Sequence, residues 1–258
     1  MRIAAWVPAA LAVGALLGCG GDTASTPSDR VVHSLQNRHY GRGDDQTYDL
    51  YWTGRRAAAP IVVVVHYGAG LYGDKADYTP AALGTRLARD GFATASINYR
   101  LAPRHVWPAA VDDVHEAIRY FGRRYGTVFV IGLSAGGWFS EQAALTPPRP
   151  SGIISVAALH DASAFKQPWP GEVLAGADAK RASPLQNVGK GFPPILLLHG
   201  DMDPIVPFGQ STRMRDVLKS KGVEVEFVRL RGASHFSPER KFLNAFYPHV
   251  ISWLRRHS

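Results

Sequence analysis

The sequence predicts an α/β protein with a mostly parallel central sheet and helices on both faces. From about residue 46 to the C-terminus, apolar runs of strand length alternate with segments of helical periodicity. The segment APIVVVVH at residues 59–66 contains a continuous β-branched run, which is typical of a strand buried on both faces of a parallel sheet. Regular alternation of strand and helix indicates a parallel sheet with crossover helices.

The individual elements follow from apolar spacing and from the residues at their ends. Gly91 follows one helical pattern and Pro108 opens the next, as helix ends and starts often do. Strands are expected at residues 47–52, 59–66, 92–98, 128–131, 152–159, 194–199 and 223–230, the first at an edge of the sheet. Helices are expected at residues 80–90, 108–122, 209–220 and 239–256, and from the turn at 132–136 to residue 145.

Length and composition restrict the classes of protein that remain. The 258 residues suffice for one large domain with a substantial core. With 46% hydrophobic and 19% charged residues, the chain has the composition of an ordinary globular protein. The net charge of +8 comes from scattered Lys and Arg, without the basic stripe of a nucleic-acid-binding protein. We interpret the charge as favouring solubility and attraction to anionic surfaces.

The N-terminus has the pattern of a targeting segment. Arg2 precedes an apolar run at residues 3–17 that is too short to span a membrane and has the layout of a secretory signal. The sequence Leu-Leu-Gly-Cys at residues 16–19 resembles the lipobox of bacterial lipoproteins. The resemblance implies cleavage after residue 18, lipidation of Cys19 and a membrane anchor in the bacterial cell envelope, periplasmic or at the cell surface. The alternative is a plain signal peptide.

The residues that follow Cys19 are expected to form a flexible tether. Residues 20–45 are rich in Gly, Ser, Thr, Asp and Pro and show no apolar periodicity. The folded domain is therefore predicted at residues 46–258. Because Cys19 is the only cysteine, no intrachain disulfide can form, and the fold depends on its core alone.

The stretch at residues 127–145 predicts a nucleophile. A G-x-S-x-G pattern at residues 132–136 lies between a buried strand and a helix, the context of a nucleophile elbow that exposes a serine hydroxyl above the sheet. Gly132 and Gly136 allow strand and helix to approach closely. The N-terminus of the helix behind Ser134 directs backbone N–H groups toward an oxyanion.

A serine nucleophile needs a base and a carboxylate, which come in the order Ser, Asp or Glu, His in this kind of sheet. His235 is the candidate base, since it follows the last strand in a loop of small residues. Asp203 in HGDMDPIVP is the preferred carboxylate, because a proline after it leads the chain away from the strand. Asp201 is expected to brace that loop and Asp161 to act as a capping or loop carboxylate.

The loop after the strand at 59–66 is expected to supply a second oxyanion donor. Its sequence, HYGAGLYGDK at residues 66–75, contains three glycines that let backbone N–H groups face the site. His66 is interpreted as a brace for this loop and not as a proton carrier. The pair Asp74 and Lys75 is expected to fasten the loop to the rest of the fold.

These motifs together resemble those of a known superfamily. The segments HYGAGLYGDK, NYRLAP, GLSAGG, HGDMDPIVP and GASH are similar to those of α/β-hydrolases in the esterase/lipase branch, which includes hormone-sensitive-lipase-like esterases, bacterial feruloyl and acetylxylan esterases and kynurenine formamidase. The resemblance covers the chain from about residue 46 to its end. It implies Ser134, Asp203 and His235 as a catalytic triad.

The same resemblance implies an oxyanion hole formed mainly by the backbone N–H groups of Gly68 and Ala135, with Tyr67 beside them. Two positions depart from the family pattern, because Tyr67 replaces the first glycine and Gly70 the usual tryptophan. Tyr67 either lines the substrate pocket or packs away from it; the sequence leaves both open.

The expected activity is hydrolysis of carboxylic esters by two-step acyl transfer, without a metal or other cofactor. An amide or formamide hydrolase with the same triad and a non-catalytic surface lipoprotein are the alternatives. The segment at residues 161–192 is too short for a large lid, so we expect an open, shallow pocket with Trp169 or Phe165 as walls. Activity should rise with pH as His235 loses its proton, at about pH 6.5 for an ordinary histidine.

Overall fold

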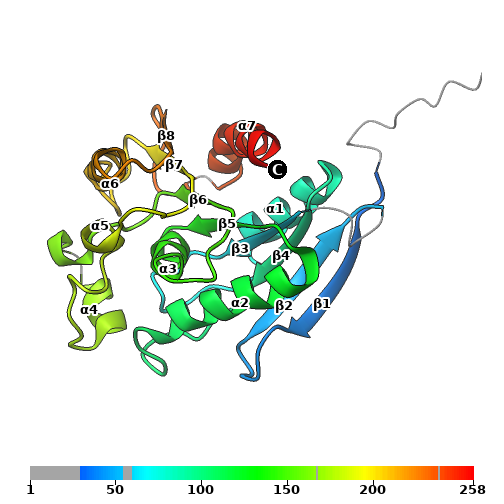
Figure 1. Cartoon of the computed structure of the whole chain (residues 1–258), viewed down its shortest axis with the longest axis horizontal. Coiled ribbons are helices and arrows are strands. Elements are labelled where there is room, and N and C mark those ends of the chain that lie inside the picture. The colour runs from blue at the N-terminus through cyan, green and yellow to red at the C-terminus, as the bar shows by residue number, and fades with distance from the viewer. Residues whose placement is uncertain (1–29, 55–59, 167, 238) are drawn as a thin grey trace, which may run out of the picture.

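The computed structural model describes residues 30–54, 60–166, 168–237 and 239–258. The predicted signal peptide at residues 1–18 and the lipidation site Cys19 lie outside the described residues and stay predictions. The described chain forms an eight-stranded sheet in the order β1-β2-β4-β3-β5-β6-β7-β8 (Figure 1). Its strands are β1 His33–His39, β2 Thr47–Trp52, β3 Ile61–Val65, β4 Ala93–Ile97, β5 Val128–Leu133, β6 Gly152–Val156, β7 Ile195–Gly200 and β8 Val225–Leu230.

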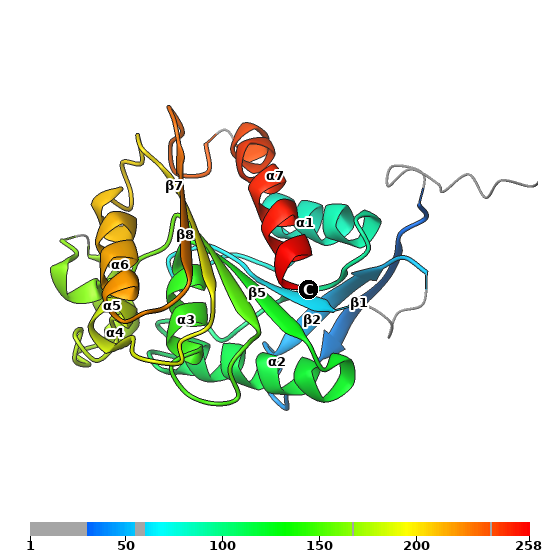
Figure 2. The ribbon, with the colours of Figure 1, turned by 45° about the horizontal axis from the view of Figure 1, so that its top comes forward.

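The helices cover both faces of this sheet. They are α1 Tyr78–Arg89, α2 Ala109–Tyr125, α3 Ala135–Ala143, α4 Trp169–Leu174, α5 Pro184–Asn187, α6 Gly209–Ser220 and α7 Glu239–His257, with a short 3-10 turn at Ala162–Ala164. Figure 2 shows α1 and α7 on one side of the sheet and α2 and α3 on the other. The mostly parallel α/β fold predicted from the sequence is therefore confirmed.

Alternating side chains of the central strands build one core on each face. Val63 and Val130 pack with α2 and α3, whereas their neighbours Val62 and Phe129 pack with α1 and α7. This division follows from the two-residue repeat of a strand, which directs successive side chains to opposite faces. All five residues of β3 are fully buried, which explains why its sequence is continuously apolar.

The strand β1 corrects the expected tether. Residues 33–39 pair antiparallel with β2, so β1 and not β2 is the edge strand and the folded domain begins before residue 46. All seven residues of β1 are exposed, and the strand therefore carries no apolar periodicity. Tertiary contacts hold β1 in place. The backbone N–H of Asn37 donates to Asp49 at 2.9 Å, and the side-chain oxygen of Asn37 accepts from Lys75 Nζ at 2.9 Å.

Several element ends also differ from the sequence prediction. The helix α2 continues through Gly122 to Tyr125 and ends at Gly126, where a φ of 74° favours glycine. The strand β5 extends to Leu133, whereas β6 ends at Val156 instead of residue 159. Buried apolar residues continue past the end of β6 as a loop, so their composition did not mark the end of the strand.

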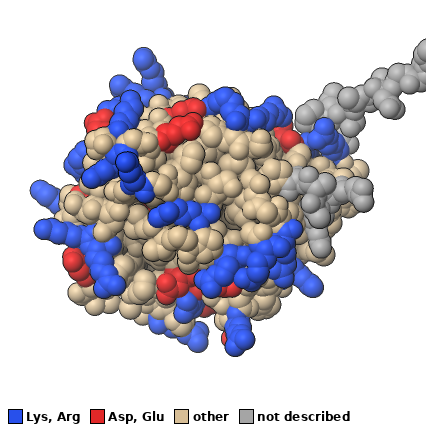
Figure 3. Space-filling view, viewed as in Figure 1, with Lys and Arg blue, Asp and Glu red and all other residues tan. Residues whose placement is uncertain are grey.

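Charged side chains are spread over the surface. Figure 3 shows Lys and Arg distributed across the visible face with Asp and Glu among them. Within the described residues, no helix is both long enough and apolar enough to cross a membrane.

The buried ion pair between Lys75 and Asp49 gives a test of how β1 and β2 are held. Their 3.2 Å contact is almost fully shielded from solvent, so Asp49→Ala should lower the free energy of unfolding by about 3–5 kcal/mol, because it leaves a buried ammonium group without its counterion. Chemical denaturation measures the change. Glu226→Ala, which removes an exposed partner of Arg256, is the control and should cost less than about 1 kcal/mol. Equal effects of the two variants would contradict the prediction.

Candidate active site

The turn between β5 and α3 has the geometry of a nucleophile elbow. Ser134 has φ 53° and ψ −116°, a strained conformation for a residue with a side chain. Two glycines make this turn possible. A Cβ on Gly132 would lie 2.4 Å from Gly137 Cα, and one on Gly136 would lie 2.3 Å from the carbonyl oxygen of Val65. Strand and helix therefore approach so closely that only glycine fits at both positions.

Ser134, His235 and Asp203 form one hydrogen-bonded line at the carboxyl edge of the sheet. Ser134 Oγ lies 3.0 Å from His235 Nε2, and His235 Nδ1 lies 2.6 Å from Asp203 Oδ2. The histidine therefore donates its Nδ1–H to the carboxylate, which leaves Nε2 free to accept the serine proton. This is the arrangement that activates a serine nucleophile.

The carboxylate of Asp203 is held in its ionised form. Its Oδ1 accepts the backbone N–H groups of Ile205 and Val206, at 2.9 and 2.8 Å, and its Oδ2 also lies 3.2 Å from His199 Nε2. Burial alone would raise the pKa of Asp203, but the hydrogen bonds from His199 and His235 hold it well below its usual range. Asp203 therefore keeps its negative charge throughout the neutral pH range.

The other candidate carboxylates have structural roles, as the sequence predicted. Asp201 accepts from Arg229 Nε and from the backbone N–H of Gly232, both at 2.7 Å, and so braces the loop that carries His235. Asp161 accepts from the Ser163 backbone N–H at 3.1 Å and from the Ser183 hydroxyl at 3.2 Å. Neither carboxylate contacts His235 in the described structure.

The loop after β3 brings the backbone of Gly68 beside Ser134, since both residues line the same cavity. Gly68 has φ 116°, and its carbonyl oxygen accepts the backbone N–H groups of Leu71 and Tyr72, at 2.9 and 3.1 Å. A Cβ on Gly68 would lie 1.8 Å from the Tyr72 carbonyl oxygen. The loop conformation thus requires glycine at this position. Ala135 begins α3 directly after Ser134, so its backbone N–H is one of the four at a helix start that lack a partner within the helix.

The same loop is anchored by its Asp-Lys pair. Asn98 donates its amide to Asp74 Oδ2 at 2.8 Å and accepts the backbone N–H of Lys75 at 2.6 Å. Lys75 then reaches Asp49 and the strand β1, as described above. These contacts give the Asp-Lys pair the fastening role that the sequence analysis expected.

His66 is a buried brace at the base of the loop. Its Nδ1 donates to the carbonyl oxygen of Tyr67 at 2.6 Å, and its ring stacks on Tyr99 with centroids 4.3 Å apart. Burial lowers the pKa of His66 to about 4, so the ring is neutral at pH 7. Its Nδ1 bonds within the loop, while the Tyr99 hydroxyl donates to its carbonyl oxygen, so it fits the bracing role expected for it.

Ser134 and His235 line an apolar cavity of about 310 Å³. Its walls include Tyr67, Leu71, Tyr72, Ile205 and Phe236. The position of Tyr67, which the sequence left open, is settled by this lining. Its hydroxyl donates to Glu239 in α7, so the aromatic ring is fixed beside the serine.

The depth of the cavity corrects the expectation of an open, shallow site. Ser134 is only 5% exposed, and the loop after β3 and Ile205 contribute walls to its cavity. Phe165 lines a neighbouring cavity of about 300 Å³ instead of the one that contains Ser134. Trp169 begins α4, and its side chain lies outside what the structure describes. Neither residue is therefore placed as a wall of the serine cavity.

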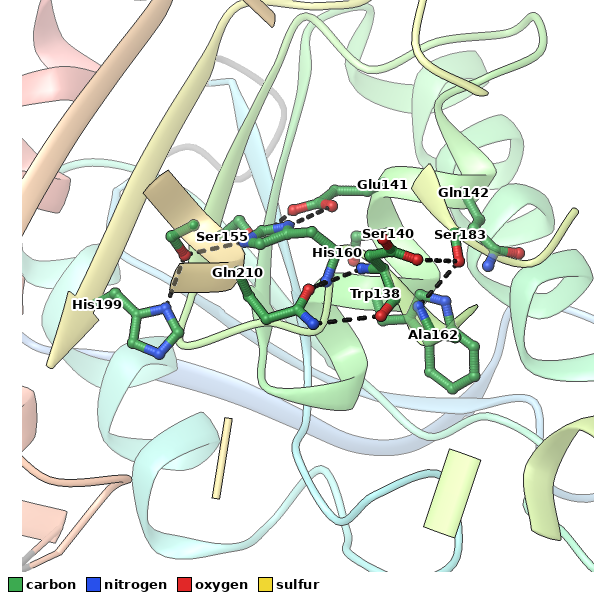
Figure 4. A network of polar contacts seen from close by, with 12 residues as sticks. Trp138, Ser140, Glu141, Gln142, Ser155, His160, Ala162, Ser183, His199 and Gln210 are labelled. Carbon is green, nitrogen blue, oxygen red and sulfur yellow. Dashed lines mark hydrogen bonds and ion pairs between the residues drawn. The ribbon is translucent and has the colours of Figure 1, made fainter. Parts of the chain in front are cut away.

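Sequence reasoning missed a group of buried polar residues behind Asp203. His199, Ser211, His160 and Glu141 are hydrogen-bonded in series and are each at most 1% exposed. Figure 4 labels the two histidines and Glu141. Two signals were available: His199 lies four residues before Asp203, and Glu141 interrupts the apolar sequence of the nucleophile helix. Within the described part of the chain, no group of three or more His, Cys, Asp or Glu side chains is arranged to hold a metal ion.

The sheet order, the elbow and the Ser-His-Asp line define an α/β-hydrolase fold. A model of the phospholipase/carboxylesterase family matches residues 111–253, and a model of the BD-FAE family matches residues 48–150. Because the first match covers more than half of the 258 residues, the chain belongs to the phospholipase/carboxylesterase family. The superfamily resemblance found in the sequence is confirmed.

Curated relatives of the chain are named as esterases. It is 31% identical over 216 residues to Esterase LipC of Mycobacterium tuberculosis, a match that covers 69% of this chain and 53% of that protein. It is 27% identical over 251 residues to Esterase LipQ of the same organism, covering 81% of this chain and 58% of that protein. The chain thus spans little more than half the length of these relatives.

Solved structures share the fold at low sequence identity. A hormone-sensitive lipase from a metagenome library superposes with a TM-score of 0.75 at 22% identity, covering 88% of this chain and 86% of that one. A truncated carbohydrate esterase from gut microbiota has a TM-score of 0.71 at 23% identity, covering 82% and 95%.

The conformation of Gly68 makes the oxyanion role expected for this loop testable. Gly68→Ala places a Cβ against the Tyr72 carbonyl oxygen at a backbone angle that favours glycine, so the loop must shift and its N–H donor must move. We expect kcat for ester hydrolysis to fall by about 100- to 1000-fold, the usual cost of one oxyanion donor. Gly171→Ala, where a Cβ meets nothing within 4 Å, is the control and should retain activity. A Gly68→Ala variant with normal kcat would exclude this loop from the oxyanion hole.

Proposed function

We propose that this protein is a serine hydrolase that cleaves carboxylic esters through an acyl-enzyme intermediate. The observation that carries the proposal is the line from Ser134 through His235 to Asp203, with bonds of 3.0 and 2.6 Å, beside an apolar cavity. Its relatives LipC and LipQ, both named esterases, favour an ester over an amide substrate.

The first step forms the acyl-enzyme. His235 Nε2 takes the proton of Ser134 as the serine oxygen attacks the ester carbonyl carbon, and the carbonyl oxygen becomes an oxyanion. The backbone N–H groups of Gly68 and Ala135 are the proposed donors to that oxyanion, with Tyr67 beside them. Collapse of the tetrahedral intermediate breaks the bond to the alcohol oxygen, which receives the proton from His235. Asp203 stabilises the imidazolium that forms in between.

The second step releases the acid. Water gives a proton to His235 and attacks the acyl carbon, a second oxyanion forms at the same donors, and Ser134 leaves with the proton that His235 returns. The apolar walls formed by Leu71, Ile205 and Phe236 favour a hydrocarbon group of the substrate next to the ester bond. A cavity of about 310 Å³ is at the lower end of the usual range for small-molecule sites, which favours short acyl chains.

Hydrolysis of p-nitrophenyl esters of graded acyl length tests the activity. The purified protein should release p-nitrophenol, fastest with short chains, and Ser134→Ala should abolish turnover above the hydroxide background. The rate should rise with pH as His235 loses its proton, because only the neutral imidazole can accept the proton of Ser134.

Two other outcomes would redirect the assignment. Cleavage of N-formyl amides with no cleavage of esters would replace the ester proposal with an amide hydrolase. A folded protein that cleaves neither would favour the non-catalytic binding alternative. A rate that stays flat from pH 5 to 9 would exclude His235 as the base.

We also propose that Cys19 carries the lipid that anchors the protein in the bacterial cell envelope, on the basis of Leu-Leu-Gly-Cys at residues 16–19. Expressed in bacteria, the unaltered chain should sediment with membranes and incorporate labelled fatty acid. The Cys19→Ser variant should lose both properties while keeping its hydrolytic activity. Label on the Cys19→Ser variant would contradict the proposal.

A further inference from the structure

A chain of buried hydrogen bonds runs from the carboxylate of Asp203 to α3, the helix that follows Ser134. Figure 4 shows His199, His160 and Glu141 of this hydrogen-bond chain. His199 in β7 contacts Asp203 through Nε2 at 3.2 Å and the hydroxyl of Ser211 in α6 through Nδ1 at 2.6 Å. Ser211 contacts His160 Nε2 at 2.9 Å, and His160 Nδ1 contacts Glu141 in α3 at 2.8 Å. None of these four residues is more than 1% exposed. Bulk solvent is therefore excluded from these bonds, so a group that loses its partner here is costly.

The position of one proton is fixed on His199, the histidine of this hydrogen-bond chain that contacts Asp203. His199 Nε2 faces the carbonyl oxygen of Val206 at 2.9 Å and Asp203 Oδ2 at 3.2 Å. The carbonyl oxygen and the ionised carboxylate only accept hydrogen bonds. His199 must therefore carry a proton on Nε2, so a neutral His199 has no proton on Nδ1.

The single hydroxyl hydrogen of Ser211 then decides which atoms donate and which accept along this hydrogen-bond chain. If Ser211 donates to His199 Nδ1, its oxygen must accept from His160 Nε2. His160 Nδ1 and Glu141 Oε2 then share one further proton, and Glu141 Oε1 accepts from the Ser155 hydroxyl at 2.6 Å. Every polar atom in the chain has a partner in this order, and His199 is neutral.

In the opposite order of donors and acceptors, the same number of protons is bound, but to different atoms. The Nε2 proton of His160 passes to Ser211 as the Ser211 proton passes to His199 Nδ1. His199 then becomes an imidazolium next to Asp203. A second cation on Asp203 would weaken its stabilisation of the imidazolium that His235 forms during the reaction. The first order is therefore the one that supports catalysis.

We propose that Glu141, His160 and Ser211 are positioning residues that keep His199 neutral and so reserve the charge of Asp203 for His235. The inference rests on the proposed serine hydrolase function. Among the described residues, the titratable groups of this hydrogen-bonded series are Asp203, His199, His160 and Glu141, and His235 is the further titratable group bonded to Asp203. Asp161, next to His160 in the sequence, directs its carboxylate to Ser163 and Ser183 instead.

The decisive variant is Ser211→Ala, which removes one oxygen atom and breaks the chain between the two histidines. We expect kcat for p-nitrophenyl butyrate to fall about 10-fold, because His199 Nδ1 loses its buried donor, with KM unchanged within about twofold. The acidic limb of the pH–rate profile should move to lower pH by about half a unit, because His199 Nδ1, without the Ser211 donor, takes up a proton from water that enters the variant, and the resulting imidazolium shares the charge of Asp203 with His235. A loss of packing alone would lower kcat without moving this limb.

A pair of variants at Glu141 tests whether His160 donates to Ser211 and Ser211 to His199. The amide of Glu141→Gln can accept from Ser155 and donate to His160 Nδ1, which holds His160 in the form that donates to Ser211. This variant should keep kcat within about twofold of the unaltered protein. Glu141→Leu has neither bond and should behave like Ser211→Ala. Ser140→Ala, which removes the hydroxyl that donates to the Gly136 carbonyl oxygen in α3, is the matched control and should leave the pH profile unchanged.

Two results would overturn the proposal: a Ser211→Ala variant with an unshifted pH profile, or a Glu141→Gln variant as impaired as Glu141→Leu. Thermal unfolding of each variant identifies losses due to misfolding. If Glu141→Leu fails to fold, Ser211→Ala and Glu141→Gln decide the question.

Labelling of Ser134 by a fluorophosphonate probe at each pH separates this proposal from the assignment of esters as substrates. The probe needs an activated serine but no particular substrate. If the unaltered protein is labelled yet cleaves no ester, the ester assignment fails, and the labelling rates of the variants decide the role of the chain. If it is not labelled, both proposals are rejected.

Discussion

The close approach of three backbone segments at Ser134 is the constraint on which the rest of the site depends. The strained conformation of this residue costs on the order of 1–3 kcal/mol, so the surrounding fold must enforce it. The strand β5 is buried along its whole length between β3 and β6. Gly132 and Gly136 then let α3 begin directly against the end of β3. A buried parallel sheet thus supports a turn that would not persist alone.

The parallel sheet also explains why four separate loops meet at one edge. The strands β3, β5, β7 and β8 are neighbours or near neighbours in the sheet order, and their carboxyl ends deliver the oxyanion loop, Ser134, Asp203 and His235. Burial of a carboxylate at this edge is costly. The backbone N–H groups of Ile205 and Val206, together with two histidines, offset that cost and keep Asp203 charged. The support extends through His199 into the core, where Ser211, His160 and Glu141 are each hydrogen-bonded.

Sequence reasoning succeeded where a residue's role is set by local pattern. Three features were visible in the amino-acid sequence alone: the β-branched run of β3, the glycines around Ser134, and the order of Ser134, Asp203 and His235. It failed for β1, because an exposed edge strand held by Asn37 and Lys75 has no apolar pattern. It also failed for the depth of the cavity, since the walls of Leu71 and Ile205 come from loops far apart in the chain.

By itself, the sequence determined the α/β architecture, the identity of the candidate triad and the need for glycine in the loop after β3, because strand composition, glycine requirements and chain order act locally. Only the tertiary structure decided that Tyr67 lines the cavity, that Ser134 lies deep within it, and that His199, Ser211, His160 and Glu141 form one buried chain. These features depend on contacts between residues that are far apart in the sequence, such as 101 positions for Ser134 and His235 and 172 for Tyr67 and Glu239. They also depend on burial, because a buried polar group without a partner is costly. No pattern along a single segment encodes such distances.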